Sequence, residues 1–169
     1  IYSGGTTGTP KGVALSNIAF NSMALQVLAM FPDFAIPGNS ILGIMPIFHG
    51  FGLGVGIHAM FVNDMQVKMY PKFDAKRFDR ILRQAQPNLL VGVPTLFEAM
   101  LRNRHIKKLD LSCVKLAISG GDLLNDTLHT EIEDLLRHTS SQANLIQGYG
   151  LAECLSVSCV TPHDMYRPN

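Results

Sequence analysis

The sequence has no marked excess of charge of either sign, and it has few cysteines. Its formal net charge at pH 7 is +1 and only 16% of its 169 residues are charged, so no general field attracts nucleic acid or an anionic membrane. A bound anion must therefore be held by a local site. The three cysteines, Cys113, Cys154 and Cys159, form no CxxC pair and have no matching histidine pair, which argues against a disulfide framework and a structural zinc site.

Other common signals are also missing. No basic segment followed by an apolar run opens the sequence, so we expect no secretory signal. Cysteines without a disulfide pattern then favour a reducing cytoplasmic location. There is no internal repeat, low-complexity tract or linker. With 47% hydrophobic residues, the chain is long enough for one domain with a sizeable core.

One uncharged segment allows two interpretations. Residues 41–62, ILGIMPIFHGFGLGVGIHAMFV, are long enough to span a bilayer. Pro46, His49, His58 and five glycines argue against a membrane helix. A buried strand, a turn and a buried helix explain the same residues, and we expect no membrane span.

Apolar runs and helical periodicity alternate along the chain. We predict strands at 40–45, 65–70, 88–93, 114–119 and 143–148, and helices at 17–31, 51–62, 74–84, from 94 onward and 125–138. Asn17 is expected to cap the first helix, and Pro94 suits a first helical turn. The continuous apolar strands and their spacing predict an α/β fold, with a mostly parallel sheet flanked by helices.

Three unusual turns follow strands of this predicted sheet. They are PIFHGFG (46–52), SGGD (119–122) and GYGLAE (148–153). Ligands of open parallel sheets bind beyond the carboxyl ends of the strands, so we expect these turns to meet at one site.

The opening stretch YSGGTTGTPKGV (2–13) has the chemistry of an anion site. Glycines allow backbone N–H groups to approach a ligand, threonines add neutral donors, and Lys11 adds charge, which together suit phosphate oxygens. A flexible loop of the same composition remains an alternative. A Walker A loop does not fit, because Pro10 stands at the second glycine and Gly12 at the Ser/Thr after the lysine.

These motifs resemble those of the adenylate-forming enzymes, which include acyl-CoA synthetases, adenylation domains and luciferases. The first is similar to the family's phosphate-binding signature, with Ser3 at a usual threonine and Gly4 at a usual serine. PIFHGFG, SGGDLL and GYGLAE are similar to three later family segments, in family order. Ala152 departs from the family, which usually has a threonine there.

The resemblance implies a two-step reaction with ATP, Mg²⁺ and coenzyme A. A carboxylic acid, with a fatty acid the favoured class, forms acyl-AMP and then passes to the thiol. A carrier-protein thiol as acceptor and a non-catalytic nucleotide-binding module are the alternatives. No nucleic acid partner is implied, the oligomeric state is unknown, and a peripheral membrane association of the whole enzyme is compatible with this reading.

The resemblance also implies roles for individual residues. The expected ATP-binding residues are Ser3, Gly4, Gly5, Thr6, Thr7, Gly8, Lys11, Gly120, Gly121, Asp122, Gln147, Gly148, Tyr149 and Gly150. Glu153, His49 and Lys11 are the expected catalytic residues, and Glu153 would hold Mg²⁺ together with Ser3. Within this set, Tyr149 would stack on the adenine.

The segment around His49 would contact the acyl group. The expected substrate-binding residues are His49, Gly50, Phe51 and Gly52. A histidine that only caps a strand in the core is the alternative for His49. For the alternate glycines from Gly50 to Gly56, an acyl pocket and close helix–sheet packing are equally compatible with the sequence.

The resemblance covers only part of such an enzyme. We expect residues 1–169 to be a fragment of the AMP-binding N-terminal domain, with 1–16 the tail of one subdomain carrying the phosphate loop. Residues from about 17 to 169 would be most of a second α/β subdomain. We expect the fragment alone to be inactive, and its opening loop to be disordered or misplaced.

Overall fold

Six strands of the described residues form one mixed sheet. Their spatial order is β4 (Gln66–Met69), β3 (Ser40–Gly43), β5 (Leu89–Gly92), β6 (Leu116–Gly120), β7 (Leu145–Tyr149) and β8 (Cys159–Thr161). The first five run parallel, and β8 pairs antiparallel with β7. These bounds come from a computed structural model that describes residues 1–3 and 8–162. The predicted α/β fold is confirmed, although the short strand β8 was not predicted.

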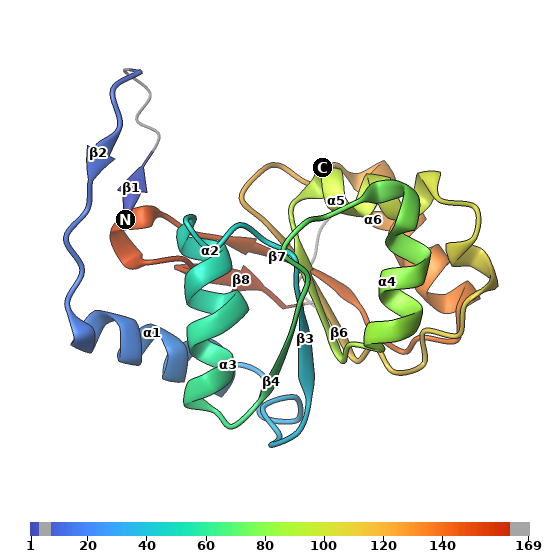
Figure 1. The fold of residues 1–169 in the computed structure, drawn as a ribbon, viewed down its shortest axis with the longest axis horizontal. Helices are drawn as coiled ribbons and strands as arrows, with labels where there is room; N and C mark the ends of the chain where they lie inside the picture. Colours follow the sequence, from blue (N-terminus) through green and yellow to red (C-terminus); the bar gives the residue numbers. More distant parts are fainter. Residues whose placement is uncertain (4–7, 163–169) are drawn as a thin grey trace.

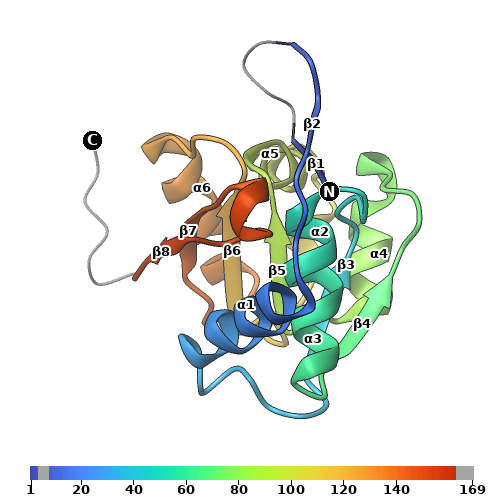
Figure 2. The same ribbon diagram turned by 90° about the vertical axis from the view of Figure 1, so that its left-hand side faces the viewer.

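Helices cover both faces of the sheet, which gives three layers (Figure 1), and α1 to α3 lie in front of the strands in Figure 2. One face carries α1 (Asn17–Ala29) and a helical segment made of α2 (Gly50–Leu53), the π-helical η1 (Gly54–His58) and α3 (Ala59–Val62). The other face carries α4 (Phe78–Ala85), α5 (Pro94–Arg102) and α6 (Asp126–His138). Three short 3₁₀ turns are η2 (Ala75–Arg77), η3 (Ile106–Lys108) and η4 (Ala152–Cys154).

Side-chain caps set several helix starts, and one of them differs from the prediction. Asn17 is the first residue of α1 and not its cap, because the Ser16 hydroxyl accepts the hydrogen bond from the Ala19 N–H at 3.2 Å. The helix also ends two residues earlier than expected. Asp74 caps η2, and Pro94 lies in the first turn of α5 as predicted.

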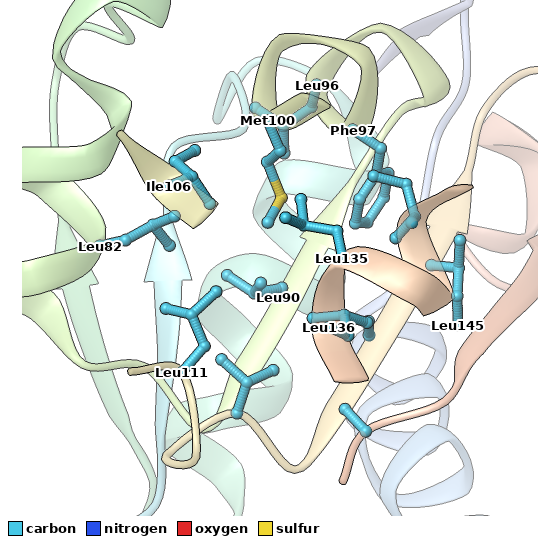
Figure 3. Packing of buried hydrophobic residues seen from close by; sticks show 14 of the residues in the cluster. Leu82, Leu90, Leu96, Phe97, Met100, Ile106, Leu111, Leu135, Leu136 and Leu145 are labelled. Atoms are coloured by element: carbon cyan, nitrogen blue, oxygen red, sulfur yellow. The ribbon is translucent and has the colours of Figure 1, made fainter. Parts of the chain in front are cut away.

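The central strands are mostly apolar because each of their faces packs against helices. On β5, Leu90 belongs to the core beneath α4, α5 and α6, whereas its neighbours Leu89 and Val91 belong to the core beneath α1 to α3. Figure 3 shows part of the first core, where Leu96, Phe97 and Met100 of α5 meet residues of α6 and β7; its labelled members are Leu82, Leu90, Leu96, Phe97, Met100, Ile106, Leu111, Leu135, Leu136 and Leu145. Burial on both faces removes the alternation expected of a half-exposed strand.

The uncharged segment 41–62 forms a strand, a turn and a helix. It contains β3, the turn that ends at His49, and the helical segment from α2 to α3. Within the part of the chain that is described, no helix is long and apolar enough to cross a membrane. The interpretation as strand, turn and helix is therefore confirmed.

The opening residues form a small antiparallel ribbon. β1 (Tyr2–Ser3) pairs with β2 (Lys11–Gly12), and the Val13 N–H donates to the Ile1 carbonyl oxygen at 2.7 Å. Figure 1 shows this ribbon rising from the edge of the molecule near α2. The ribbon does not join the six-stranded sheet, and the boundary near residue 17 between two subdomains stays a prediction.

Candidate functional site

The carboxyl ends of β6 and β7 and the segment that joins β3 to α2 meet at a cavity of about 450 Å³. The turns after these strands supply most of its wall, and the opening ribbon supplies the rest. The predicted site residues that line it are Ser3, Lys11, His49, Gly50, Phe51, Gly120, Gly121, Gly148, Tyr149, Gly150 and Glu153. The structure thus brings together residues from both ends of the chain, as the turn positions predicted.

A second cavity of about 430 Å³ lies beside the first. The two cavities share Gly121, Gly148, Tyr149 and Gly150. The second is also lined by Asp122 and Gln147, which were predicted, and by Leu123, Cys159 and Thr161, which were not. Both volumes lie within the range of about 300–1,000 Å³ that is usual for small-molecule sites.

Tyr149 stands between the two cavities at the end of β7. Its side chain is 60% exposed, so a ring face is available for stacking. Gly120 ends β6 beside it, and Gly121, the next residue, has a φ of +80°, which favours glycine. The Asp122 carboxylate accepts a hydrogen bond from the Leu123 N–H at 2.7 Å and so shapes the same turn. A flat aromatic ring opposite bare backbone suits a planar base.

His49 has a defined orientation at the start of α2. Its Nδ1 accepts a hydrogen bond from the Phe51 N–H at 3.1 Å, which makes it the N-cap of the helix. The neutral ring then carries its hydrogen on Nε2. The residue is exposed and lines the larger cavity, so the alternative of a histidine in the core is wrong.

The glycines after His49 are explained by close packing at three positions. A Cβ at Gly50 would overlap the Leu155 carbonyl oxygen, and one at Gly52 would overlap the Pro46 carbonyl oxygen. A Cβ at Gly54 would come within 2.9 Å of the Met23 methyl group. Packing therefore accounts for Gly50, Gly52 and Gly54, whereas a Cβ at Gly56 would meet only the Phe51 carbonyl oxygen at 3.9 Å.

The turn after Tyr149 places Glu153 on the rim of the larger cavity. The Ser158 N–H donates to the Tyr149 carbonyl oxygen at 2.8 Å and closes the turn. Gly150 is required there, because a Cβ would overlap the Ser156 carbonyl oxygen. Leu155 is buried with a φ of +69°, a strained value that the surrounding packing must maintain. Glu153 itself lies in η4 and is exposed.

Lys11 and Glu153 place opposite charges on the same cavity wall. Magnesium is usually held by one or two carboxylates together with substrate phosphates, so one carboxylate fits that ion. Among residues 1–3 and 8–162 there is no group of three or more side chains suited to hold a metal alone. The residues present thus fit a metal that arrives with a phosphate ligand.

Two residues that sequence reasoning missed hold the start of β7. His129 and Glu133 lie one turn apart on α6, and both are buried. The His129 Nε2 hydrogen-bonds the Leu145 carbonyl oxygen at 2.9 Å, and a Glu133 carboxylate oxygen accepts from the Leu145 N–H at 3.3 Å. These bonds satisfy the backbone C=O and N–H groups of Leu145, which precedes the residues of β7 that pair with β8, starting at Gln147. Their spacing of four on one helix was the available signal.

The remaining predicted residues differ in whether they are described and whether they line a cavity. Gly4, Gly5, Thr6 and Thr7 lie outside the described residues. Gly8 is described and exposed but lines neither of the two cavities, and Gly52 also lines neither. At the ends of the opening loop, Ser3 and Lys11 border the larger cavity, so the expectation that this loop is misplaced is wrong for these residues.

Residues 1–169 match the family described as AMP-binding enzyme. The chain belongs to this family. It is 30% identical over 157 residues to a long-chain-fatty-acid–CoA ligase of Bacillus subtilis (strain 168), covering 93% of this chain and 27% of that protein. It is 32% identical over 154 residues to 4-coumarate–CoA ligase 3 of Arabidopsis thaliana, covering 90% and 27% of the two chains.

A comparison with solved structures agrees with the assignment of this chain to the AMP-binding family. The crystal structure of ATP-bound MatB from Rhodopseudomonas palustris matches with a TM-score of 0.82 and 25% identity, covering 99% of this chain and 31% of that one. The chain thus spans only about three-tenths of the length of these relatives. The sequence resemblance to adenylate-forming enzymes is confirmed.

Proposed function

We propose that the chain is the nucleotide-binding part of a longer carboxylate-activating ligase. Such an enzyme forms acyl-AMP from ATP and a carboxylic acid and then passes the acyl group to coenzyme A. The observation that supports this best is the pair of cavities that meet at Tyr149, with Lys11 and Glu153 on the wall of the larger one. Its relatives named as CoA ligases support the same reaction class.

The nucleotide would be divided between the two cavities. Its base would stack on Tyr149 opposite Gly120 and Gly121, where the backbone is bare. Its phosphates would lie toward Ser3 and Lys11, since a lysine and a hydroxyl donate charge-assisted and neutral hydrogen bonds to phosphate oxygens. Gly4, Gly5, Thr6, Thr7 and Gly8 are proposed to add donors from the loop between them.

Mg²⁺ is proposed to bind at Glu153, with Ser3 as a second oxygen ligand. When bound, the ion neutralises phosphate charge as the negative charge shifts onto pyrophosphate. Glu153 supplies the fixed charge for it from a 3₁₀ turn anchored by the buried Leu155. Lys11 faces the same cavity and would stabilise charge on the departing phosphates.

The carboxylic acid is proposed to enter beside His49. The carboxylate oxygen attacks the α-phosphorus, the bond to the β-phosphate oxygen breaks, and pyrophosphate leaves. A thiol then displaces AMP from the acyl carbon. His49, held by the Phe51 N–H, presents Nε2–H as a donor near this group. A fatty acid is the favoured class, in line with the long-chain-fatty-acid–CoA ligase among the relatives.

The test is pyrophosphate exchange by the full-length protein, with a panel of aliphatic and aromatic carboxylic acids. We expect exchange that depends on both ATP and an acid, with hydroxylamine trapping the acyl group. ATP binding without any exchange would favour a non-catalytic nucleotide-binding module. Acyl transfer to a carrier-protein thiol but not to coenzyme A would favour an adenylation domain.

A further inference from the structure

Three side-chain hydrogen bonds join β7 to helix α6 and to the turn that leads into it. Two are at the start of the strand, where the Leu145 carbonyl oxygen accepts from His129 Nε2 and the Leu145 N–H donates to Glu133. The third is two residues further on, where the Gln147 side-chain amide donates to the Leu124 carbonyl oxygen at 3.2 Å. The helix and the strand are thus fixed to each other at two levels along β7.

The two bonds at Leu145 take the place of a neighbouring strand. The Ala117 N–H of β6 donates to the Asn144 carbonyl oxygen at 3.3 Å. Successive residues of a strand direct their backbone groups to alternate sides, so those of Leu145 point away from β6. On that side β8 pairs with β7 only from Gln147 onward. The two side chains of α6 therefore satisfy an outward-facing residue that β8 does not reach.

These bonds also fix the register of β7. Glu133 needs an N–H and His129 needs a carbonyl oxygen, and a shift of one residue would offer them a residue whose backbone groups face β6. Such a slip would also move each side chain of the strand to the other face. Leu145, Gln147 and Tyr149 share one face because they alternate along the strand. The clamp, defined as His129 and Glu133, therefore keeps the Tyr149 ring on the face that α6 covers.

The smaller cavity lies between the two elements that the clamp joins. One part of its wall is the turn at residues 121–123, and another is the end of β7, with Gln147 and Tyr149. The turn is itself fixed to α6, since the Asn125 side chain caps the helix by accepting from the Leu128 N–H at 2.8 Å. A shift of α6 relative to β7 would therefore change the width of this cavity.

We propose that His129 and Glu133 are positioning residues for the nucleotide base. Neither lines one of the two cavities; they act by holding β7 against α6, which sets the separation between Tyr149 and the turn at 121–123. Both side chains are buried, at a cost in free energy that packing alone does not require. This role rests on the proposed function, because it takes the occupant of the smaller cavity to be a base.

The test is ATP binding by full-length variants that remove or keep these hydrogen bonds. Glu133→Leu removes the acceptor for the Leu145 N–H, and His129→Leu removes the donor to the Leu145 carbonyl oxygen. Each should raise the Kd for ATP about tenfold, which is part of the roughly 150-fold that complete loss of stacking costs at most. Glu133→Gln keeps an acceptor and His129→Gln keeps a donor, so both should bind ATP nearly as tightly as wild type.

Three controls separate positioning from a general loss of stability. Leu136→Ala removes packing from the same helix, in the core shown in Figure 3, without removing a hydrogen bond to β7. It should lower the midpoint of thermal unfolding and leave the Kd for ATP unchanged. Inorganic triphosphate has no base, so its Kd should be the same in every variant. In a Tyr149→Ala background, Glu133→Leu should add little to the loss of ATP affinity, because both changes act through the same ring.

The outcomes separate this role from the proposed function. Wild-type ATP affinity in both leucine variants would overturn the positioning role and leave the proposed function intact. An equal loss in Leu136→Ala, or an equal loss of triphosphate affinity, would show a general effect and overturn the role as well. Absence of ATP binding by wild type would contradict the proposed function itself. If Glu133→Leu does not fold, His129→Leu decides the question, with His129→Gln as its matched control.

Discussion

Tyr149 and Cys159 are Cα partners in the antiparallel pairing of β7 with β8. Both line the smaller cavity, Tyr149 from the end of one strand and Cys159 from the start of the next. The cysteine is exposed, so it places a thiol at the wall of the proposed base-binding site. Cys159 is a neighbour of Tyr149 because the chain turns back after Glu153. Its thiol can therefore serve as a chemical probe of the site.

Alkylation of Cys159 should therefore report nucleotide binding. We expect iodoacetamide to label Cys159 readily at neutral pH and ATP to slow that labelling, because a bound base would cover the cavity. Peptide mass spectrometry of the full-length protein would measure both rates. Equal labelling with and without saturating ATP would contradict the placement of the base.

Cys113 provides the internal control for this labelling. Burial raises the pKa of its thiol, and the thiolate is the reactive form. Its alkylation should be slow at neutral pH, should rise only at more alkaline pH than for an ordinary thiol, and should not respond to ATP. Protection of Cys113 by ATP would indicate a general stabilisation of the protein and not local cover.

Removal of the Tyr149 ring should weaken ATP binding. Stacking of a base on an aromatic side chain contributes about 1–3 kcal/mol, so Tyr149→Ala is expected to raise the Kd for ATP between about fivefold and 150-fold. Tyr149→Phe keeps the ring and should bind within about twofold of wild type. Calorimetric titration of both variants measures the difference, and an equal loss in both would point to the hydroxyl instead.

Glu153→Gln should abolish most adenylation while the fold is retained. The side chain keeps its size but loses the charge proposed to hold Mg²⁺, and loss of one such group costs about a hundredfold or more in rate. Since Glu153 is exposed, thermal unfolding should be unchanged. Pyrophosphate exchange near the wild-type rate would remove Glu153 from the proposed site.

The glycines of the α2–η1 segment should differ sharply in their tolerance of a methyl group. Gly52→Ala forces a Cβ onto the Pro46 carbonyl oxygen and should lower the free energy of unfolding by about 1–3 kcal/mol. Gly56→Ala has space and should be neutral or stabilising by up to about 1 kcal/mol. Urea unfolding of both variants compares them, and equal effects would refute the packing explanation.

A protein made of residues 1–169 alone should not catalyse acyl-adenylate formation. Its two cores supply a folded sheet, but we propose that a longer ligase provides further charged groups at the transition state, and several such losses together should leave no measurable rate. The assay is acyl-adenylate formation with ATP, Mg²⁺ and mixed fatty acids. Product at ordinary enzyme rates would show that these residues suffice.

Much of the fold could be predicted because the buried strands are mostly apolar and the helices are periodic. The strand at 88–93 and the helix at 125–138 correspond to β5 and α6 within one or two residues at each end. The strand β8 could not be predicted, since Cys159–Thr161 is too short for a pattern and is ordered by pairing with β7. The α1 cap was misplaced because Ser16 and Asn17 are both good capping residues and only the backbone geometry chooses between them.

The sequence by itself determined the residue types of the candidate site and their order along the chain. Glycine turns at strand ends, Tyr149, Lys11 and Glu153 identified the family, because local chemistry limits what can bind phosphate or stack on a base. Only the tertiary structure decided which of them share a cavity and why Gly50 and Gly52 are required. Those relationships depend on contacts between distant segments, and such contacts leave no local pattern in the chain.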